Sequence, residues 1–352
     1  MRAFACPACA AFTPFEADRC AACRTPVGLH LPTTSMVALD GDAVRVDGQR
    51  WIRCTQAETL QCNWLVPDEH VDAGQRGRCL ADSLIRREPD AADTVAREKL
   101  VPTTAALRRL VFQLLDIGLP VEPYFRRTGG LAFDLLSSFS EDRPVTIGHA
   151  DGVITIDLVE SLDAYRESLR VRLGEPYRTM LGHFRHEVGH YYQNVLVETG
   201  PGAQRHLTEC RALFGDERAG YGEAIDRHYR FGAPADWQDT FISEYATMHP
   251  WEDFAECFAH YLHITDTLDT AREAGMVLHA DRVRFRAPRD VTPSPCYDDA
   301  SVHRLLDDWA WIALFFNRVN TAMGKPPLYP FTIPPPVADK LDFVHRVIRE
   351  ER

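Results

Sequence analysis

The chain carries HEVGH at residues 186–190, inside the longer run LGHFRHEVGHYYQNVL (181–196). Apolar residues recur along this run at steps of three and four, which predicts a helix with one apolar stripe. The residues of this stripe are Leu181, Phe184, Val188, Tyr191 and Val195. Two histidines four positions apart project from one face of a helix, so a single ion can bind an imidazole nitrogen of each. His186 and His190 are therefore predicted to bind zinc, and Glu187 is predicted to be the general base of a hydrolase.

A second stretch, FISEYATMHPWEDFAECFAHYLH (241–263), supplies the acidic residues that such a site needs. Pro250 favours a helix start, and from there Glu252 and Glu256 lie about one turn apart on one face. Aromatic residues and cysteine flank this face rather than Lys and Arg, so both carboxylates are expected to point inward, where they need a cation. We expect Glu252 to be the third zinc ligand and Glu256 to accept an imidazole N–H that fixes a ligand's tautomer. The alternative is a solvated helix face.

Tyr245 precedes Glu252 by seven residues. A zinc ion only partly neutralises the oxyanion of a tetrahedral intermediate, and a phenol can donate a hydrogen bond to that oxyanion without adding charge. Tyr245 is therefore predicted to be a catalytic donor. His249 and His263 are the competing donors, and a tyrosine that only packs against Phe241 is the alternative.

Two C-x2-C knuckles lie near the N-terminus, the first formed by Cys6 and Cys9 and the second by Cys20 and Cys23. Such a pair places four thiolates around one tetrahedral zinc ion. A segment this short has too few apolar residues to fold without a covalent or metal crosslink. We predict one structural zinc here. A zinc ribbon can bind protein or nucleic acid or only stabilise one end of a chain, and the spacing does not choose among these roles.

Three more cysteines, Cys54, Cys62 and Cys79, follow within 26 residues. Asp82 stands where the C-x2-C partner of Cys79 would be, and a carboxylate oxygen can bind zinc. His70 is also in range as the fourth ligand, and three thiols without a metal are the remaining possibility. The sequence thus predicts one catalytic zinc and one or two structural zincs.

The composition limits the partners and the compartment. The 352 residues include 39 Lys and Arg against 51 Asp and Glu, a net charge of −12, which disfavours binding of nucleic acid or anionic membrane by the whole surface. No run of about 18 apolar residues is present, and the N-terminus lacks an apolar segment followed by a cleavage site. We expect a cytoplasmic protein without membrane contact, in a reducing compartment where metal thiolates explain ten cysteines better than disulfides do.

The rest of the chain predicts helices and a small sheet. Strands are predicted as a hairpin over residues 37–52 and singly over residues 130–136, 144–149 and 152–158. Helices are predicted over residues 90–115 and 161–173. Glu175-Pro176 is expected to open the zinc helix. The strand from Ile154 to Leu158 is either an edge strand that binds an extended substrate or part of an ordinary sheet.

These motifs resemble a bacterial family of zinc-binding metallopeptidases with an N-terminal zinc ribbon, and the resemblance spans nearly the whole chain. The segments that carry it are EPYRT (175–179), GHFRHEVGHYY (182–192), HPWEDFAE (249–256) and the N-terminal cysteine array. HExxH followed by Glu252-x-x-x-Glu256 resembles the gluzincin pattern, and with Tyr245 it is similar to the catalytic domain of anthrax lethal factor. The family usually has cysteine where this chain has Asp82, which bears on the second structural zinc.

We therefore expect an α+β protein with a cysteine-rich zinc-ribbon region at residues 1–87 and a mostly helical zincin-like metallopeptidase domain at residues 88–352. The expected function is zinc-dependent hydrolysis of peptide bonds in a peptide or protein substrate. The alternative is a zinc ribbon that binds protein or nucleic acid, attached to a zincin domain that is inactive or is activated by a partner. An intact HExxH with a third acidic ligand favours the enzyme.

Overall fold

The computed structural model describes residues 2–69, 77–141, 144–161, 179–283, 288–294, 297 and 301–351. The chain divides into two compact units. The first comprises Met1–Phe112 and Val121–Leu162, and the second comprises Gln113–Pro120 and Asp163–Arg352. The expected boundary between residues 87 and 88 stays a prediction.

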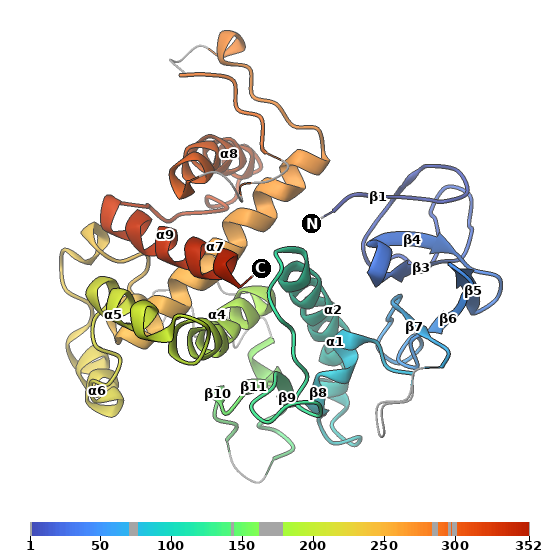
Figure 1. The fold of residues 1–352 in the computed structure, drawn as a ribbon, viewed down its shortest axis with the longest axis horizontal. Coiled ribbons are helices and arrows are strands. Elements are labelled where there is room, and N and C mark those ends of the chain that lie inside the picture. The colour runs from blue at the N-terminus through green and yellow to red at the C-terminus, as the bar shows by residue number, and fades with distance from the viewer. Residues whose placement is uncertain are drawn as a thin grey trace. The chain divides into compact units, whose positions relative to one another are not determined.

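The cysteine-rich part of the first unit is built from short antiparallel strands (Figure 1). They are β1 (Phe4–Ala5) with β2 (Phe12–Thr13), β3 (Val27–His30) with β4 (Ser35–Ala38), and the sheet β5 (Ala43–Val46), β6 (Gln49–Arg53) and β7 (Leu65–Pro67). The predicted hairpin is present as β5 and β6, and its turn at Asp47-Gly48 has positive φ at both residues, as a two-residue hairpin turn requires. Val37 pairs instead within β3 and β4.

A four-stranded sheet completes the first unit, in the order β10, β11, β9, β8. Its strands are β8 (Ile85–Arg87), β9 (Ala132–Leu136), β10 (Gly148–Ala150) and β11 (Val153–Asp157). The strands predicted over residues 130–136 and 152–158 are therefore confirmed as β9 and β11. The strand predicted over residues 144–149 is confirmed only at residues 148 and 149, because β10 begins at Gly148 and residues 144–147 form no regular element. The idea that Ile154–Leu158 is an edge strand is wrong, because β11 pairs with β10 on one side and with β9 on the other. The parallel partner β9 comes from a distant part of the sequence, and local alternation cannot reveal such a neighbour.

Two helices belong wholly or mainly to the first unit. The four-residue helix α1 (Leu80–Ser83) follows Cys79, whose sulfur accepts a hydrogen bond from the Asp82 backbone N–H. The predicted helix over residues 90–115 is α2 (Thr94–Asp116). Asp93 caps its start, because the Asp93 carboxylate accepts a hydrogen bond from the Ala96 N–H. The apolar stripe of α2, including Leu107 and Leu110, is fully buried.

The second unit is helical. Its helices are α4 (Met180–Tyr192), α5 (Ala203–Phe214), α6 (Tyr221–Phe231), α7 (Pro250–Glu273), α8 (Val302–Ala322) and α9 (Pro335–Glu350). The long helix α7 packs against α4, α5, α8 and α9, and is the central element of this unit (Figure 1). It begins at Pro250, as predicted, and the side chain of His249 caps it by accepting from the Trp251 N–H. The mostly helical α+β class is confirmed.

Two further expectations concern the helix predicted before the HEVGH segment and contact with a membrane. The predicted helix over residues 161–173 and the Glu175-Pro176 helix start lie outside the described residues, except for residue 161, which ends a short 3-10 turn. Among the helices of the described ranges, none combines the length and apolar character that crossing a membrane requires.

Candidate metal centre

Helix α4 presents the HEVGH residues from a largely buried position. Thr179 caps it by accepting the Gly182 N–H at 3.0 Å through its hydroxyl. The side chains of His186 and His190 are 12% and 10% exposed, respectively, so both imidazoles are shielded but not sealed from solvent. This is the accessibility that a metal ligand beside a substrate site needs.

The two histidines and Glu252 converge. Glu252 Oε2 lies 3.0 Å from Nε2 of His186 and 3.5 Å from Nε2 of His190, and one ligand atom from each residue lies within 4.8 Å of the others. Burial raises the pKa of Glu252, but the imidazoles beside it outweigh burial and hold that pKa well below its usual value. Two imidazole nitrogens and one carboxylate oxygen are the donor set of many catalytic zinc sites, so the residues present fit a zinc ion.

Glu256 is not one of these three converging residues but contacts one of them, His186. Its Oε1 accepts from Nδ1 of His186 at 2.7 Å, and its Oε2 accepts from the Ser243 hydroxyl at 2.6 Å. An imidazole held in this way through Nδ1 presents Nε2 to a metal. His190 differs, because its buried Nδ1 has no hydrogen-bond partner among the described residues.

Glu187 is buried close to His183 and His186. Its Oε1 lies 3.4 Å from Nε2 of His183, whereas its Oε2 is buried without a hydrogen-bond partner in the part of the chain that the structure describes. Burial raises the pKa of Glu187, but His183 and His186 lower it by a larger amount. The resulting pKa is below the usual value. Glu187 is thus a carboxylate with one open acceptor. Sequence reasoning missed His183, although its place four residues before Glu187 on one helix face could have indicated it.

Tyr245 and its competitors occupy different places. Tyr245 lies on the 3-10 turn Tyr245–Thr247, and its ring centroid is 5.7 Å from that of His186. Nδ1 of His249 accepts from the backbone of Trp251, and Nδ1 of His263 bonds to the guanidinium of Arg185 at 2.7 Å. Both competing histidines therefore make contacts that stabilise the helices.

Tyr221 is the residue of this site that sequence reasoning missed most completely. Its hydroxyl donates to Oε1 of Glu252 at 2.7 Å. The two residues are 31 positions apart on different helices, and no motif links them. Spacing within a helix could not have indicated this pair.

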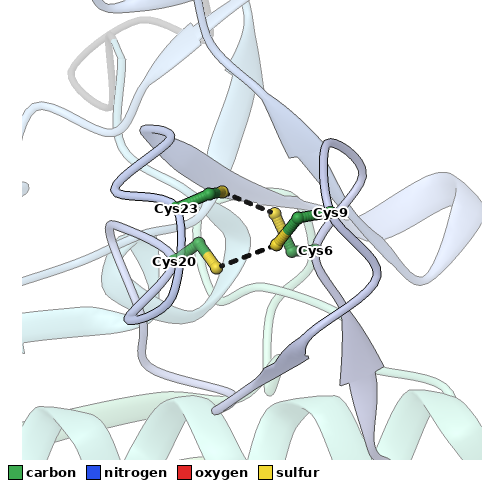
Figure 2. A group of neighbouring side chains, drawn as sticks. All are labelled: Cys6, Cys9, Cys20 and Cys23. Atoms are coloured by element: carbon green, nitrogen blue, oxygen red, sulfur yellow. Dashed lines mark hydrogen bonds between the residues drawn. The ribbon is translucent and has the colours of Figure 1, made fainter.

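The four N-terminal cysteines converge as predicted (Figure 2). Sγ of Cys6 lies 3.6 Å from Sγ of Cys23, and Sγ of Cys9 lies 3.7 Å from Sγ of Cys20. All four sulfurs are within 4.8 Å of one another. The Thr25 hydroxyl and backbone amide lower the pKa of Cys23 to about 6, which favours the thiolate that zinc binds. This cluster fits a tetrahedral structural zinc.

A second cluster joins Cys54, Cys62, Cys79 and Asp82, again with ligand atoms within 4.8 Å. Sγ of Cys62 is 3.6 Å from Sγ of Cys79, and Sγ of Cys54 is 3.3 Å from Asp82 Oδ2. The structure therefore brings Asp82 to the fourth position, and His70 lies outside the described residues.

The fully buried Asp82 has a cationic partner that the sequence did not reveal. Its Oδ1 accepts from Arg108 Nη1 at 3.0 Å, and Arg108 Nη2 donates to the Leu60 carbonyl at 2.9 Å. Burial raises the pKa of Asp82 to about 6 and Cys54 adds to this effect, while Arg108 opposes it. The guanidinium therefore compensates part of the negative charge that three thiolates and a carboxylate would concentrate here.

Comparisons with known proteins identify the family that this chain is similar to. The chain matches a family model described as "Putative zinc-binding metallo-peptidase" over residues 97–347 and a zinc-ribbon domain model over residues 3–93. One protein of Mycobacterium bovis and one of Mycobacterium tuberculosis, both named as uncharacterized proteins, are each 41% identical over 352 residues. The match covers 99% of this chain and 96% of each relative. No solved structure matches the chain.

Proposed function

The chain belongs to the family of zinc-binding metallopeptidases, and from this premise we propose that it hydrolyses peptide bonds in a peptide or protein substrate. The observation that carries the proposal is the convergence of His186, His190 and Glu252 beside a carboxylate, Glu187, with one open oxygen. When bound, zinc would polarise a water molecule and bring the pKa of that water close to neutral. Its three ligands follow the gluzincin pattern.

Glu187 is the proposed general base. Its lowered pKa keeps the carboxylate ionised at neutral pH. Its Oε2, which no described residue contacts by a hydrogen bond, is the atom that accepts the proton of the attacking water. The same oxygen then delivers that proton to the leaving amine. His183 holds the other oxygen and so orients the carboxylate.

Two more residues support the proposed reaction. Glu256, held by Ser243, fixes the ring of His186. Tyr245 is the proposed donor to the oxyanion that forms at the scissile carbonyl, and the short distance between its ring and that of His186 supports this role.

The cysteine clusters are proposed to hold structural zinc. The four cysteines Cys6, Cys9, Cys20 and Cys23 would hold one ion, and the cluster of Cys54, Cys62, Cys79 and Asp82 would hold a second. The cysteines of both clusters lie in turns and loops between short strands, and Asp82 lies in the four-residue helix α1. Elements this short do not fold by apolar burial alone, so zinc binding contributes folding free energy there.

The decisive test replaces Glu187 with Gln in the full-length protein. The amide has a similar shape but cannot accept a proton, so the variant should keep its zinc and lose hydrolysis of a denatured protein substrate. Cleavage is measured by mass spectrometry of the products, and zinc by native mass spectrometry. Undiminished cleavage by Glu187→Gln would exclude Glu187 as the base, and absence of wild-type cleavage from a broad peptide library would contradict the proposed function.

A further inference from the structure

The two carboxylate oxygens of Glu252 have different partners, and Tyr221 is the partner of one of them. The Tyr221 hydroxyl donates to Oε1 at 2.7 Å. The other oxygen, Oε2, faces Nε2 of His186 at 3.0 Å and Nε2 of His190 at 3.5 Å. One oxygen of this carboxylate is therefore presented to the metal-binding set while the other is engaged elsewhere.

The partly exposed ring of Tyr221 lies against two other aromatic rings. It is the first residue of α6, and its ring lies edge-on to the rings of His249 at 5.2 Å and Trp251 at 6.2 Å between centroids. Because backbone carbonyls only accept and backbone N–H groups only donate, His249 donates through Nε2 to the Ala219 carbonyl and accepts through Nδ1 from the Trp251 N–H. One imidazole thus joins the start of α6 to the first turn of α7, where Glu252 lies.

We propose that Tyr221 is a positioning residue that fixes Glu252 as a one-oxygen metal ligand, an inference that rests on the proposed function. A carboxylate can bind a metal through one oxygen or two, and a hydrogen bond to one oxygen favours binding through the other alone. One-oxygen binding keeps a coordination position free for water and substrate, as catalytic zinc sites require. A phenol suits the task because its ordinary pKa of about 10 keeps its proton in place at neutral pH.

A bond that only ties α6 to α7 is the competing explanation, and the two make different predictions. If the bond were only structural, its removal would lower the stability of the protein without altering the coordination of the metal. If Tyr221 positions Glu252, its removal changes both the affinity and the coordination geometry at the site, even in protein that stays folded.

The test is Tyr221→Phe in the full-length protein, because this change keeps the ring and removes only the hydroxyl. Zinc affinity is measured by competition with a chromogenic chelator, and coordination by the visible absorption of protein loaded with Co²⁺. We expect zinc affinity at the site to fall by about 10- to 100-fold and the Co²⁺ spectrum to change. Tyr229→Phe is the matched control, since Tyr229 lies on the same helix and is 63% exposed, and it should behave as the wild type. Circular dichroism confirms that both variants are folded.

His186→Ala separates this site from the structural zincs, because the zinc that this variant loses is the zinc of the catalytic site. Affinity within threefold of the wild type and an unchanged Co²⁺ spectrum in Tyr221→Phe would overturn the inference, while the proposed function would stand. If His186→Ala instead held as much zinc as the wild type, the metal site itself would be refuted, and the role of Tyr221 with it.

Discussion

Gly189 of α4 lies directly against the backbone of α7, because a Cβ at this position would come within 2.8 Å of the Ala255 Cα. This close approach brings the helix that carries both histidines to the helix that carries Glu252. A backbone atom cannot move aside as the end of a flexible side chain can, so any side chain at position 189 would push the helices apart.

Gly189→Ala should therefore destabilise the protein by about 1–3 kcal/mol, although alanine is the better helix former by about 1 kcal/mol. It should also weaken zinc binding, because Glu252 would move away from the histidines. Gly222→Ala is the control, since a Cβ there meets nothing within 4 Å, and it should leave stability unchanged or raise it. Thermal unfolding and chelator competition measure the two effects. Equal behaviour of both variants would refute the importance of the close approach.

Substitutions of Glu252 and Glu256 should have different effects on zinc binding. Glu252→Ala should lose the catalytic zinc outright, because it removes a ligand. Glu256→Ala should keep the zinc but bind it about 10- to 100-fold more weakly, since only the partner of the His186 Nδ1–H is lost. Zinc counts and affinities of both variants check this order, and the reverse pattern would exchange their roles.

Tyr245→Phe tests the proposed oxyanion donor. Without the hydroxyl, kcat should fall by about 10²–10³-fold with little change in KM, because the lost hydrogen bond exists only in the transition state. Zinc affinity should stay close to that of the wild type, which distinguishes this variant from Tyr221→Phe. An unchanged kcat would remove Tyr245 from the mechanism.

The buried ion pair beside the site makes a prediction about stability and pH. Lys340 Nζ lies 2.6 Å from Asp253 Oδ2, donates to the Thr240 carbonyl, and sits 4.3 Å from the ring centroid of Phe241. Lys340→Met should cost about 3–5 kcal/mol at pH 8, because it leaves a buried carboxylate without a cation. The double variant with Asp253→Asn should recover much of that loss.

The sign of the pH dependence follows from Asp253. Burial raises the pKa of Asp253 to about 7, and Lys340 opposes this rise. Because the folded-state pKa lies above the ordinary value of about 3.9, protonation of this carboxyl stabilises the fold. This stabilisation is fully present below the ordinary pKa and is lost as the pH rises through 7. Without Lys340 the folded-state pKa rises further. In urea unfolding, Lys340→Met should therefore have a lower free energy of unfolding than the double variant at pH 8, and this difference should shrink as the pH falls to 5. A difference that stays constant would show that lost packing, not charge, is the cause.

The sequence could predict features that depend on short spacing. His186 and His190 are four residues apart on one helix, Pro250 opens the helix that carries Glu252, and each pair of N-terminal cysteines forms a knuckle, so local geometry alone places these groups. The family likeness that these motifs indicated was also confirmed. The assignment of metal-binding and catalytic roles to individual residues stays a prediction.

Other features depend on contacts between distant segments. Tyr221, at the start of α6, contacts Glu252 of α7, and His249 links the segment just before α6 to the start of α7. Arg108 reaches Asp82 because α2 packs beside the second cysteine cluster, and β11 acquires its second neighbour through a parallel pairing with β9. A single sequence contains no local pattern for such contacts, since they depend on how complete elements pack.

Asp82 decides the expected number of zinc ions. Three thiolates and one carboxylate around Zn²⁺ carry a net charge of −2, and Arg108 reduces it to −1 in a buried place. Asp82→Ala removes a ligand and leaves Arg108, which is 2% exposed, without its carboxylate. The variant should therefore lose this zinc and unfold more readily, because an unpaired buried charge is strongly destabilising.

Native mass spectrometry should find three zinc ions in the wild type and two in Asp82→Ala, with the catalytic zinc retained. Cys6→Ser should also hold two, but it should damage folding more than turnover per folded molecule, because the zinc of the first cluster contributes to folding. Asp82→Cys is the informative companion, since it keeps the ligand count and net charge of the cluster but removes the carboxylate that accepts from Arg108 Nη1. It should still bind three zinc ions. Two zinc ions in both Asp82→Ala and the wild type would show that the second cluster is not a zinc site, whereas three in both would show that Asp82 is not a required ligand.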